Sequence, residues 1–388
     1  MRDDKIHIGV IGAGTMGTGI AQLFAYSGYL VKTYDVNKQA LNNSIRNIKN
    51  VLQNLSQKGK IEVNKIDSIL SLIHPQNGLD GFSDCKIIIE AAAEDVNVKK
   101  DIFRRLESLI NSACILASNT SSLSITSIAS VCTSPERVIG THFFNPAPVM
   151  KLVEIIPGLL TSEDTIKITR DVIQSLNKIT VIAKDTPGFI VNRVARPFYG
   201  EALRILEEGI ADHVTIDWAM KEFGGFKMGP FELMDLIGND INYKVTETVF
   251  SEMYFDTRYK PSIIQKRMVE AGLLGRKSGR GFYSYSQENP EPERDMRKGE
   301  RIFERILFML INEAADMLHF NITSESDLDL AVKHALNYPK GLIEWAYDYG
   351  IETVMDGINK LYSEYNEDRY RPSAHLKKMS LKEQKGIA

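Results

Sequence analysis

The stretch that most constrains the fold of this chain lies near the N-terminus and reads KIHIGVIGAGTMGTGIAQLFAYSGYLVKTYDV. It consists of an apolar strand-like run, a glycine-rich turn, an apolar helical pattern and a second strand-like run. Gly12, Gly14 and Gly17 have G-x-G-x-x-G spacing within this order. The first glycine of such a turn permits the tight bend, the second lets a pyrophosphate approach the backbone, and the third lets the helix pack on the strand. The pattern predicts a dinucleotide-binding unit.

A carboxylate follows this unit where a nucleotide ribose is expected. Asp35 ends the second strand-like run, close to the ~20 residues that usually separate the glycine-rich turn from a ribose-binding acid. The phosphates are expected at the helix N-terminus, where free N–H groups and the helix dipole favour anions. An acid at the ribose accepts hydrogen bonds from its hydroxyls and repels a 2′-phosphate. Asp35 therefore favours NAD over NADP, and FAD is the less favoured alternative.

The composition limits the classes of protein to which the chain can belong. Its 388 residues suffice for two or three domains, and 43% hydrophobic with 25% charged residues is typical of a soluble globular protein. The net charge of −3 provides no basic field for nucleic acid or a membrane surface. No apolar run reaches the ~18 residues of a membrane helix, and MRDDKIHIGV is unlike a signal peptide. Cys85, Cys114 and Cys132 are expected to be reduced thiols of a cytoplasmic protein.

Strand-like and helical patterns alternate up to about residue 185. Such alternation predicts a parallel, doubly wound sheet with helices on both faces, and it leaves the order of the last strands open. Beyond the breaker DTPGF at 185–189 the pattern is helical, and one long helix is expected over NRVARPFYGEALRILEEG. The strand-like runs are IHIGVIG, VKTYDV, KIIIEAA, CILASN, RVIGTHFF, KLVEII and ITVIAK.

An internal repeat lies in the helical part of the chain. Residues 313–350 match residues 201–238 at a constant offset of 112. Matched glycines inside helical patterns make a chance similarity unlikely, and we interpret the later copy as a degenerate structural copy that packs on the earlier one. The matched pairs are Glu201-Ala202 with Glu313-Ala314, Ile216-Asp217 with Leu328-Asp329, Ala219 with Ala331, Gly229 with Gly341, Glu232 with Glu344, and Gly238 with Gly350.

These patterns define the predicted fold class and domains. The chain is expected to have an α/β Rossmann-type N-terminal domain followed by an all-α C-terminal domain present as two tandem copies. A polar, proline-containing stretch between the copies is typical of a linker. The predicted bounds are 1–185 for the NAD-binding domain, 186–286 for the helical substrate domain, 287–300 for the linker and 301–388 for the second copy.

Residues 138–154, VIGTHFFNPAPVMKLVE, contain the candidate acid–base pair. A single histidine, His142, ends one apolar strand-like run, and Glu154 lies in the next run after a short proline-rich loop. If the two runs lie side by side, Glu154 can reach His142, and a carboxylate orients an imidazole and makes it more basic. The alternative for these two residues alone is a core histidine and a solvated glutamate.

Seven motifs in a fixed order resemble the L-3-hydroxyacyl-CoA dehydrogenase family, which includes 3-hydroxybutyryl-CoA dehydrogenases. The resemblance covers about residues 5–285, and the tail from 300 resembles the second C-terminal repeat of longer members. It implies reversible, NAD-dependent oxidation of (S)-3-hydroxyacyl-CoA to 3-ketoacyl-CoA in fatty-acid β-oxidation or butanoate-type metabolism. The motifs are GAGTMGTGIA, EAAAED (90–95), SNTSSL (118–123), HFFNPAPVMKLVE (142–154), KDTPGFIVNR (184–193), MGPFEL (228–233) and GRKSGRGFYSY (275–285).

The resemblance assigns roles residue by residue. His142 is the expected catalytic base and Glu154 its partner, Ser121 is expected near the reacting oxygen, and Asn192 is the expected substrate contact from the helical domain. The CoA phosphates are expected at a lysine after Asp35, for which Lys58 is the nearest match; no metal is expected. The cofactor contacts implied are Gly12, Gly14, Thr15, Met16, Gly17, Asp35, Glu94, Lys99, Ser121, Asn145 and Lys277.

Alternatives remain for three of these side chains. Ser121 precedes a helical pattern and can instead be a helix N-cap. Asn192 can instead bond to the start of its own helix. For the CoA phosphates, the basic residues near Lys58 fit equally well; these are Arg46, Lys49 and Lys60. Any one of these four side chains can instead lie on a solvated helix face.

Two other functions also fit the scaffold. One is an NAD-dependent dehydrogenase of a non-CoA hydroxy acid or sugar acid, and the other is a non-enzymatic NAD-binding structural protein. The complete set of His142, Glu154, Ser121 and Asn192 favours the acyl-CoA enzyme. The second helical copy is expected to carry no catalytic group and to allow a monomer, and a dimer through another surface stays open.

Overall fold

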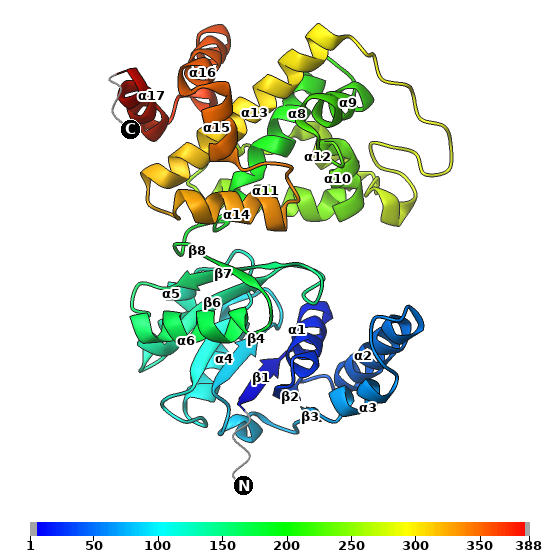
Figure 1. Cartoon of the computed structure of the whole chain (residues 1–388), viewed down its shortest axis with the longest axis vertical. Helices are drawn as coiled ribbons and strands as arrows, with labels where there is room; N and C mark the ends of the chain where they lie inside the picture. The colour runs from blue at the N-terminus through cyan, green and yellow to red at the C-terminus, as the bar shows by residue number, and fades with distance from the viewer. Residues whose placement is uncertain (1–5, 385–388) are drawn as a thin grey trace. The chain divides into compact units, whose positions relative to one another are not determined.

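The protein divides into two compact units, residues 1–186 and 187–388, in a computed structural model that describes residues 6–384. The first unit is an α/β domain and the second is helical (Figure 1). Within the described residues, no helix combines the length and the apolar character that crossing a membrane requires.

The α/β unit contains one sheet of eight strands in the order β3-β2-β1-β4-β5-β6-β7-β8. All neighbouring strands are parallel except β6 and β7, which are antiparallel because a short loop joins them. The three-residue edge strand β3 was not predicted, since IHP is too short to show an alternating pattern. The strands are β1 (His7–Ile11), β2 (Leu30–Tyr34), β3 (Ile73–Pro75), β4 (Ile87–Glu90), β5 (Ile115–Ser118), β6 (Val138–Phe143), β7 (Leu152–Pro157) and β8 (Ile179–Ile182).

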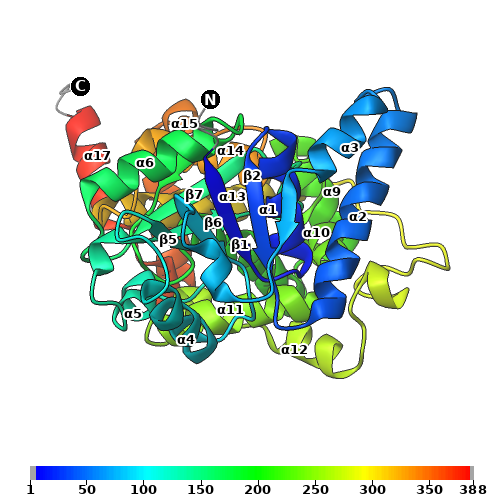
Figure 2. The ribbon, with the colours of Figure 1, turned by 90° about the horizontal axis from the view of Figure 1, so that it is seen from below.

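Helices cover both faces of this sheet, as the alternation of elements predicts. One face packs in a single apolar core with α1, α2, α3 and α6, to which Phe24, Ile48 and Ile173 contribute. The other face packs against α4 and α5, and Gly140 of β6 leaves room there for Ile125 of α5. Figure 2 shows α6 on one side of the strands and α4 with α5 on the other. The helices are α1 (Thr15–Tyr26), α2 (Lys38–Gln57), α3 (Asn64–Leu70), α4 (Val96–Glu107), α5 (Ile125–Ala129) and α6 (Glu163–Gln174).

The parallel strands bring separate motifs to one edge of the sheet. Strands β1, β2, β4, β5 and β6 run in the same direction, so their carboxyl ends lie at the same edge. The glycine-rich turn follows β1, and Asp35 follows β2. His142 lies near the end of β6. In open α/β sheets this edge is where ligands bind.

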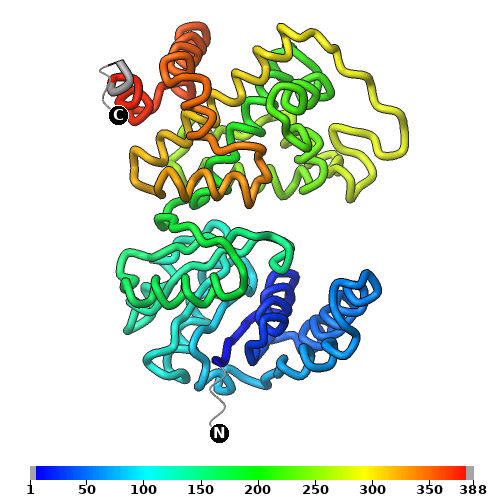
Figure 3. Tube along the Cα trace, viewed as in Figure 1, coloured from blue at the N-terminus to red at the C-terminus, as the bar shows by residue number. Residues whose placement is uncertain are grey.

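The helical unit differs from the sequence prediction at two places. The expected single helix after DTPGF is broken at Ala195 into α7 and α8, because Pro197 lacks an N–H and favours the first turn of a new helix. The predicted linker ends five residues early: Asp295 accepts N–H bonds from Arg297 and Lys298, so α13 begins at Met296. Figure 3 shows the chain before α13 as an extended stretch.

The first helical copy contains α7 to α12, and the second contains α13 to α17. The helices are α7 (Val191–Val194), α8 (Arg196–Glu207), α9 (His213–Gly224), α10 (Pro230–Ile237), α11 (Asn239–Glu252), α12 (Ile263–Glu270), α13 (Met296–His319), α14 (Glu325–Ala335), α15 (Leu342–Tyr349), α16 (Ile351–Tyr365) and α17 (Ala374–Gln384).

The internal repeat is visible as matching helices with matching caps. The starts of α9, α10 and α11 recur in α14, α15 and α16 at the offset of 112. In the first copy Asp217 accepts the N–H bonds of Phe231 and Glu232, and in the second Asp329 accepts those of the counterparts of these two residues. A Cβ at Gly229, or at its counterpart, would clash with the capping carboxylate. The matched acids and glycines are therefore structural.

The two copies pack on each other through α13, which contacts α8 and α9 of the first copy. The fit is close, because a Cβ at Gly299 would lie 2.6 Å from Trp218 and one at Gly224 would lie 2.6 Å from Phe303. The second copy therefore folds back onto the first within the same chain.

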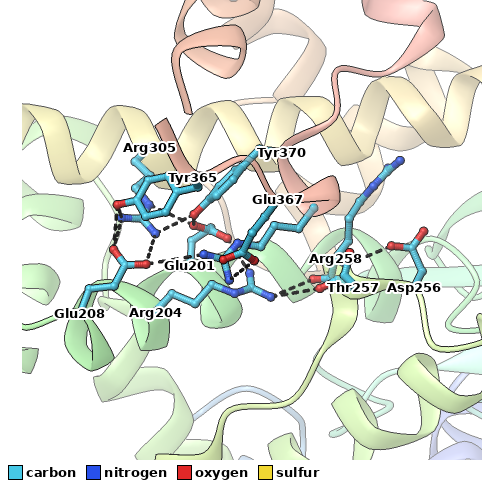
Figure 4. Close-up of polar contacts among 11 residues, drawn as sticks. Glu201, Arg204, Glu208, Asp256, Thr257, Arg258, Arg305, Tyr365, Glu367 and Tyr370 are labelled. Carbon is cyan, nitrogen blue, oxygen red and sulfur yellow. Dashed lines mark hydrogen bonds and ion pairs between the residues drawn. The ribbon is translucent and has the colours of Figure 1, made fainter. Parts of the chain in front are cut away.

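Two buried polar clusters join the copies, and each contains a fully buried glutamate. In the first, Glu201 of α8 accepts hydrogen bonds from Arg305 Nε at 3.1 Å and from the Tyr370 hydroxyl at 3.0 Å (Figure 4). In the second, Glu313 of α13 accepts bonds from Arg193 Nε at 2.6 Å and the Tyr259 hydroxyl at 2.7 Å. The offset relates Glu201 to Glu313 and Arg193 to Arg305. The contacts are reciprocal, as in an isologous dimer interface.

Candidate active site

The glycine-rich turn has the geometry that its spacing predicts. Gly12 has a positive φ of 101°, and a Cβ there would clash with the carbonyl of Ala91. A Cβ at Gly17 would clash with the Gly12 carbonyl, so this glycine lets α1 pack on β1. A Cβ at Gly14 would meet nothing within 4 Å. Gly14 therefore leaves the start of α1 open to a ligand.

Asp35 lies against this turn. Its Oδ2 accepts the Ala13 N–H bond at 2.7 Å, and its Oδ1 accepts the Asn37 N–H bond at 2.7 Å. These bonds fix the carboxylate beside the start of α1, and each carboxylate oxygen has a second lone-pair direction for a hydroxyl donor. Gly14, the helix start with Thr15 and Met16, and Asp35 together fit the pyrophosphate and ribose of NAD.

His142 and Glu154 form the pair that the sequence predicts. They are direct register partners on the antiparallel strands β6 and β7. His142 Nδ1 lies 2.6 Å from Glu154 Oε2, and both side chains are buried, with Glu154 fully inaccessible. An ionised Glu154 accepts the Nδ1–H bond, which places the lone pair of a neutral imidazole on Nε2. The ring of Phe144 packs on the imidazole with 4.4 Å between centroids.

The loop after β5 carries Ser121 and is held by Glu94. Glu94 Oε1 accepts bonds from Thr120 Oγ1 at 2.6 Å, Ser121 N at 2.9 Å and Ser121 Oγ at 3.2 Å. Burial opposes ionisation of Glu94, but the nearby Lys99 ammonium and these hydrogen bonds outweigh it and lower the pKa of Glu94. The cap of α5 is Ser124, which accepts the Ser127 N–H bond, so Ser121 is not that N-cap.

Lys99 is almost fully buried, with 1% of its surface exposed. Its Nζ lies 2.8 Å from Glu90 Oε1 and 3.4 Å from Glu94 Oε2. Glu90 also accepts bonds from Ser118 Oγ at 2.7 Å and Ala92 N at 2.6 Å. The lysine that the resemblance gives as a cofactor contact is thus part of a buried network that fixes Glu94.

Sequence reasoning missed other residues that connect these loops. Asn119 Oδ1 accepts the Phe143 N–H bond at 2.9 Å, which ties the Ser121 loop to the strand of His142. Asp185 accepts bonds from Ile125 N at 2.9 Å and Thr126 N at 2.7 Å, which ties DTPGF to α5. The local sequence gave no signal for either bond, because each joins segments far apart in the chain.

The remaining predicted residues lie at separate places. Asn145 is exposed in the loop two residues after the end of β6, with a cis peptide bond to Pro146. Lys58 is exposed at the C-cap of α2. Asn192 is half-buried on α7 of the helical unit. Lys277 is on the 3₁₀ turn η4 (Arg276–Ser278) of the same unit, and its Nζ pairs with Asp240 at 2.6 Å.

Among the described residues, no group of three or more histidine, cysteine or acidic side chains could hold a metal ion. Within the α/β unit, the candidate site combines a nucleotide turn, a serine loop and a His–Glu pair at one edge of a sheet.

Comparison with known proteins assigns both units to one family. The model of the 3-hydroxyacyl-CoA dehydrogenase NAD-binding domain matches residues 7–186. The model of the 3-hydroxyacyl-CoA dehydrogenase C-terminal domain matches twice, at residues 188–285 and 302–388. The second match covers the later helical copy.

Similar proteins are named as dehydrogenases of individual 3-hydroxyacyl-CoA thioesters. The 3-hydroxyadipyl-CoA dehydrogenase of Escherichia coli is 34% identical over 97% of this chain and 98% of its own length. A 3-hydroxybutyryl-CoA dehydrogenase of Clostridioides difficile is 42% identical over 72% of this chain and 99% of its own. The crystal structure of a 3-hydroxybutyryl-CoA dehydrogenase from E. coli has a TM-score of 0.94 at 32% identity, covering 99% of this chain and all of that one. The chain belongs to the 3-hydroxyacyl-CoA dehydrogenase family.

Proposed function

We propose that the protein oxidises (S)-3-hydroxyacyl-CoA to 3-ketoacyl-CoA with NAD, reversibly. One observation carries the proposal: the buried His142–Glu154 pair lies at the same carboxyl edge of the sheet as the glycine-rich turn and Asp35. A base and a nucleotide turn at one edge are what alcohol oxidation by a dinucleotide requires. The family match supports the thioester substrate.

The acid–base step belongs to His142. In the oxidation direction Nε2 accepts the 3-hydroxyl proton, and Glu154 stabilises the imidazolium through Nδ1–H. In the reduction direction the imidazolium returns the proton to the oxygen of the former ketone. Bound NAD supplies the hydride acceptor at its nicotinamide ring.

Ser121 is proposed to lie near the reacting oxygen. Its backbone N–H and its hydroxyl both donate to Glu94, which Lys99 fixes, so its single O–H would turn from Glu94 to the reacting oxygen when substrate binds. We propose Glu94 as the cofactor-side contact and Lys99 as the residue that positions it. Asn192, Asn145, Lys277 and Lys58 remain proposals that rest on the family resemblance.

A substrate panel tests this function. Purified protein is assayed for NADH oxidation with acetoacetyl-CoA, 3-ketoadipyl-CoA and longer 3-ketoacyl-CoA thioesters. The matched free acid, acetoacetate, serves as the control that lacks only the CoA group. Turnover of the thioesters and none of the free acid is expected. Turnover of acetoacetate alone would favour the non-CoA dehydrogenase, and no NADH oxidation with any of these compounds would favour an NAD-binding protein without activity.

Two further properties are proposed with the function. In the clusters of Glu201 and Glu313, each helical copy supplies the charge partners of the other, and we propose that the chain acts as a monomer.

A cytoplasmic location is proposed because the three cysteines are thiols whose pKa values burial raises to about 11 or 12, typical of inert packed cysteines.

A further inference from the structure

Lys178 is a buried ammonium that binds backbone carbonyls. It lies between α6 and β8, with 7% of its surface exposed. Its Nζ donates to the Ala147 carbonyl at 2.7 Å and the Met150 carbonyl at 2.6 Å, and lies 3.4 Å from the Pro148 carbonyl. Among the described residues, no carboxylate is a charge partner of Lys178, and burial alone shifts its pKa. All of its partners belong to one loop.

A buried cation without a carboxylate partner lowers stability unless its hydrogen bonds offset the lost hydration free energy. Burial lowers the pKa of Lys178 to about 8, which reflects this cost. An apolar side chain of the same length would avoid this cost, but it would donate no hydrogen bond to the Ala147 and Met150 carbonyls. The position of these carbonyls is therefore the property that the lysine controls.

The loop that Lys178 holds joins the two catalytic strands. It runs from the end of β6 to the start of β7, between His142 and Glu154. Its first residue, Phe144, packs on the His142 ring. His142 and Glu154 are register partners, so the β6–β7 ladder sets the spacing of the two strands, and the loop sets the position of the Phe144 ring against the imidazole.

The other side of this loop touches the nucleotide-binding helix. A Cβ at Gly19 of α1 would lie 3.3 Å from Pro148 Cδ and 3.4 Å from Ala147 Cβ. The loop is thus clamped between Gly19 and the ammonium of Lys178. A shift of the loop would move both the support of His142 and the surface of α1.

We infer that Lys178 is a positioning residue for the dehydrogenase reaction: by binding the Ala147 and Met150 carbonyls, it holds the loop that orients His142 beside the nucleotide-binding helix. This inference rests on the proposed function. Misplacing a catalytic group by about 1 Å can cost on the order of 10²-fold in rate. Lys178 therefore acts on the chemical step without touching the substrate.

The test compares Lys178→Met and Lys178→Arg with a matched control, Arg137→Met. Arg137 is also 7% exposed and donates to the Asn111 and Cys114 carbonyls, and it has a carboxylate partner besides, Glu107 at 3.4 Å. It lies just before β6, at the end opposite His142. Each variant is checked for folding by circular dichroism and for NADH binding by fluorescence. Then kcat, KM and the isotope effect of deuterated NADH are measured with an active 3-ketoacyl-CoA.

Lys178→Met is expected to lower kcat roughly 10- to 100-fold with a smaller change in KM, and to raise the isotope effect because hydride transfer becomes limiting. Lys178→Arg should recover most of the loss, and Arg137→Met should lose thermal stability while keeping kcat. Hydrogen exchange of residues 144–151 should rise in Lys178→Met alone. The inference is overturned if folded Lys178→Met keeps wild-type kcat and isotope effect, or if Arg137→Met loses kcat equally.

A second variant keeps the test decisive if Lys178→Met does not fold. Gly19→Ala presses on the same loop from the opposite side and leaves the lysine intact. It should lower kcat and raise the isotope effect in the same direction, and an unchanged kcat would contradict the clamp. Inactivity of the wild-type protein with every thioester would instead contradict the proposed function, and the exchange measurement would still test the loop.

Discussion

Glu201 and Glu313 lie 112 residues apart, and each is bound by an arginine and a tyrosine of the other helical copy. Arg305 and Tyr370 bind the first glutamate, while Arg193 and Tyr259 bind the second. A dimer of single-copy chains would produce such a reciprocal pair through symmetry. Here one chain supplies both halves.

Removing one of these carboxylates should destabilise the helical unit. Glu313→Gln leaves Arg193 and Arg258 buried with only Asp316 as an acidic partner, and breaking a buried pair costs about 3–5 kcal/mol. Urea unfolding measures the change, and Glu300→Gln on the exposed side of the same helix is the control. An effect no larger than that of the control would refute a stabilising role for this cluster.

Acid should weaken the same cluster. Burial opposes ionisation of Glu313, but Arg193 and Arg258 outweigh it and lower its pKa below the ordinary 4.5. A carboxyl group with a lowered folded-state pKa stabilises the protein above its unfolded pKa, and this contribution is lost as pH falls through the folded value. Wild-type stability should therefore fall below about pH 4.5, with a shallower fall in Glu313→Gln. Parallel pH profiles of the two proteins would contradict this assignment.

Truncation tests whether the second copy replaces a partner subunit. A chain ending at residue 290 loses α13 and exposes the apolar face around Trp218 that Gly299 and Phe303 contact. Exposed patches of this kind drive association, so the truncated chain should dimerise or aggregate, whereas the full chain should be monomeric. Light scattering measures both. A truncated protein that stays a stable monomer argues against this packing as the reason for a monomeric full chain.

Cofactor choice should depend on Asp35. Asp35→Ser removes the charge that repels a 2′-phosphate and weakens the bonds to Ala13 and Asn37 beside the turn. NADH binding should weaken, and the preference for NADH over NADPH should narrow. The ratio of kcat/KM for the two cofactors measures this, with Asp84→Ser, an acid at the surface of the same unit, as the control. An unchanged ratio would show that Asp35 does not select the cofactor.

Glu154→Gln should impair catalysis while the fold remains intact. The amide keeps the size of the carboxylate but removes the charge that stabilises the His142 imidazolium. A loss of kcat on the order of 10²–10⁴-fold is expected, the range for a positioned acid–base group. Circular dichroism and NADH binding should match the wild type. A variant that binds NADH and retains full kcat would exclude Glu154 from the acid–base step.

The sequence predicts those parts of the site whose residues lie close together in the chain. Gly12, Gly14 and Gly17 occupy one turn, and His142 and Glu154 occupy two strands joined by a short loop, so spacing alone brings each set together. The repeat was also readable, because its capping acids and glycines recur at a fixed offset.

Contacts between distant segments could not be predicted in this way. Lys178 binds carbonyls about 30 residues earlier, and the burial of Lys99 beside Glu90 depends on how α4 packs on the sheet. Carbonyl partners leave no side-chain pattern in a sequence. The break at Ala195 was not predicted because Pro197 begins a new helix inside a continuous helical pattern. The early start of α13 was not predicted because Asp295 caps a helix inside a stretch with the composition of a linker.

The most direct test of the account is a comparison of wild type with His142→Gln in the reduction of an active 3-ketoacyl-CoA by NADH. Because His142 is the only proposed proton donor, the variant should bind NADH as the wild type does and lose roughly 10²–10⁴-fold in kcat. His74, an exposed histidine on β3 of the same unit, provides the control, and His74→Gln should retain full activity. Near-normal turnover by folded His142→Gln would contradict the assignment of His142 as the catalytic acid–base.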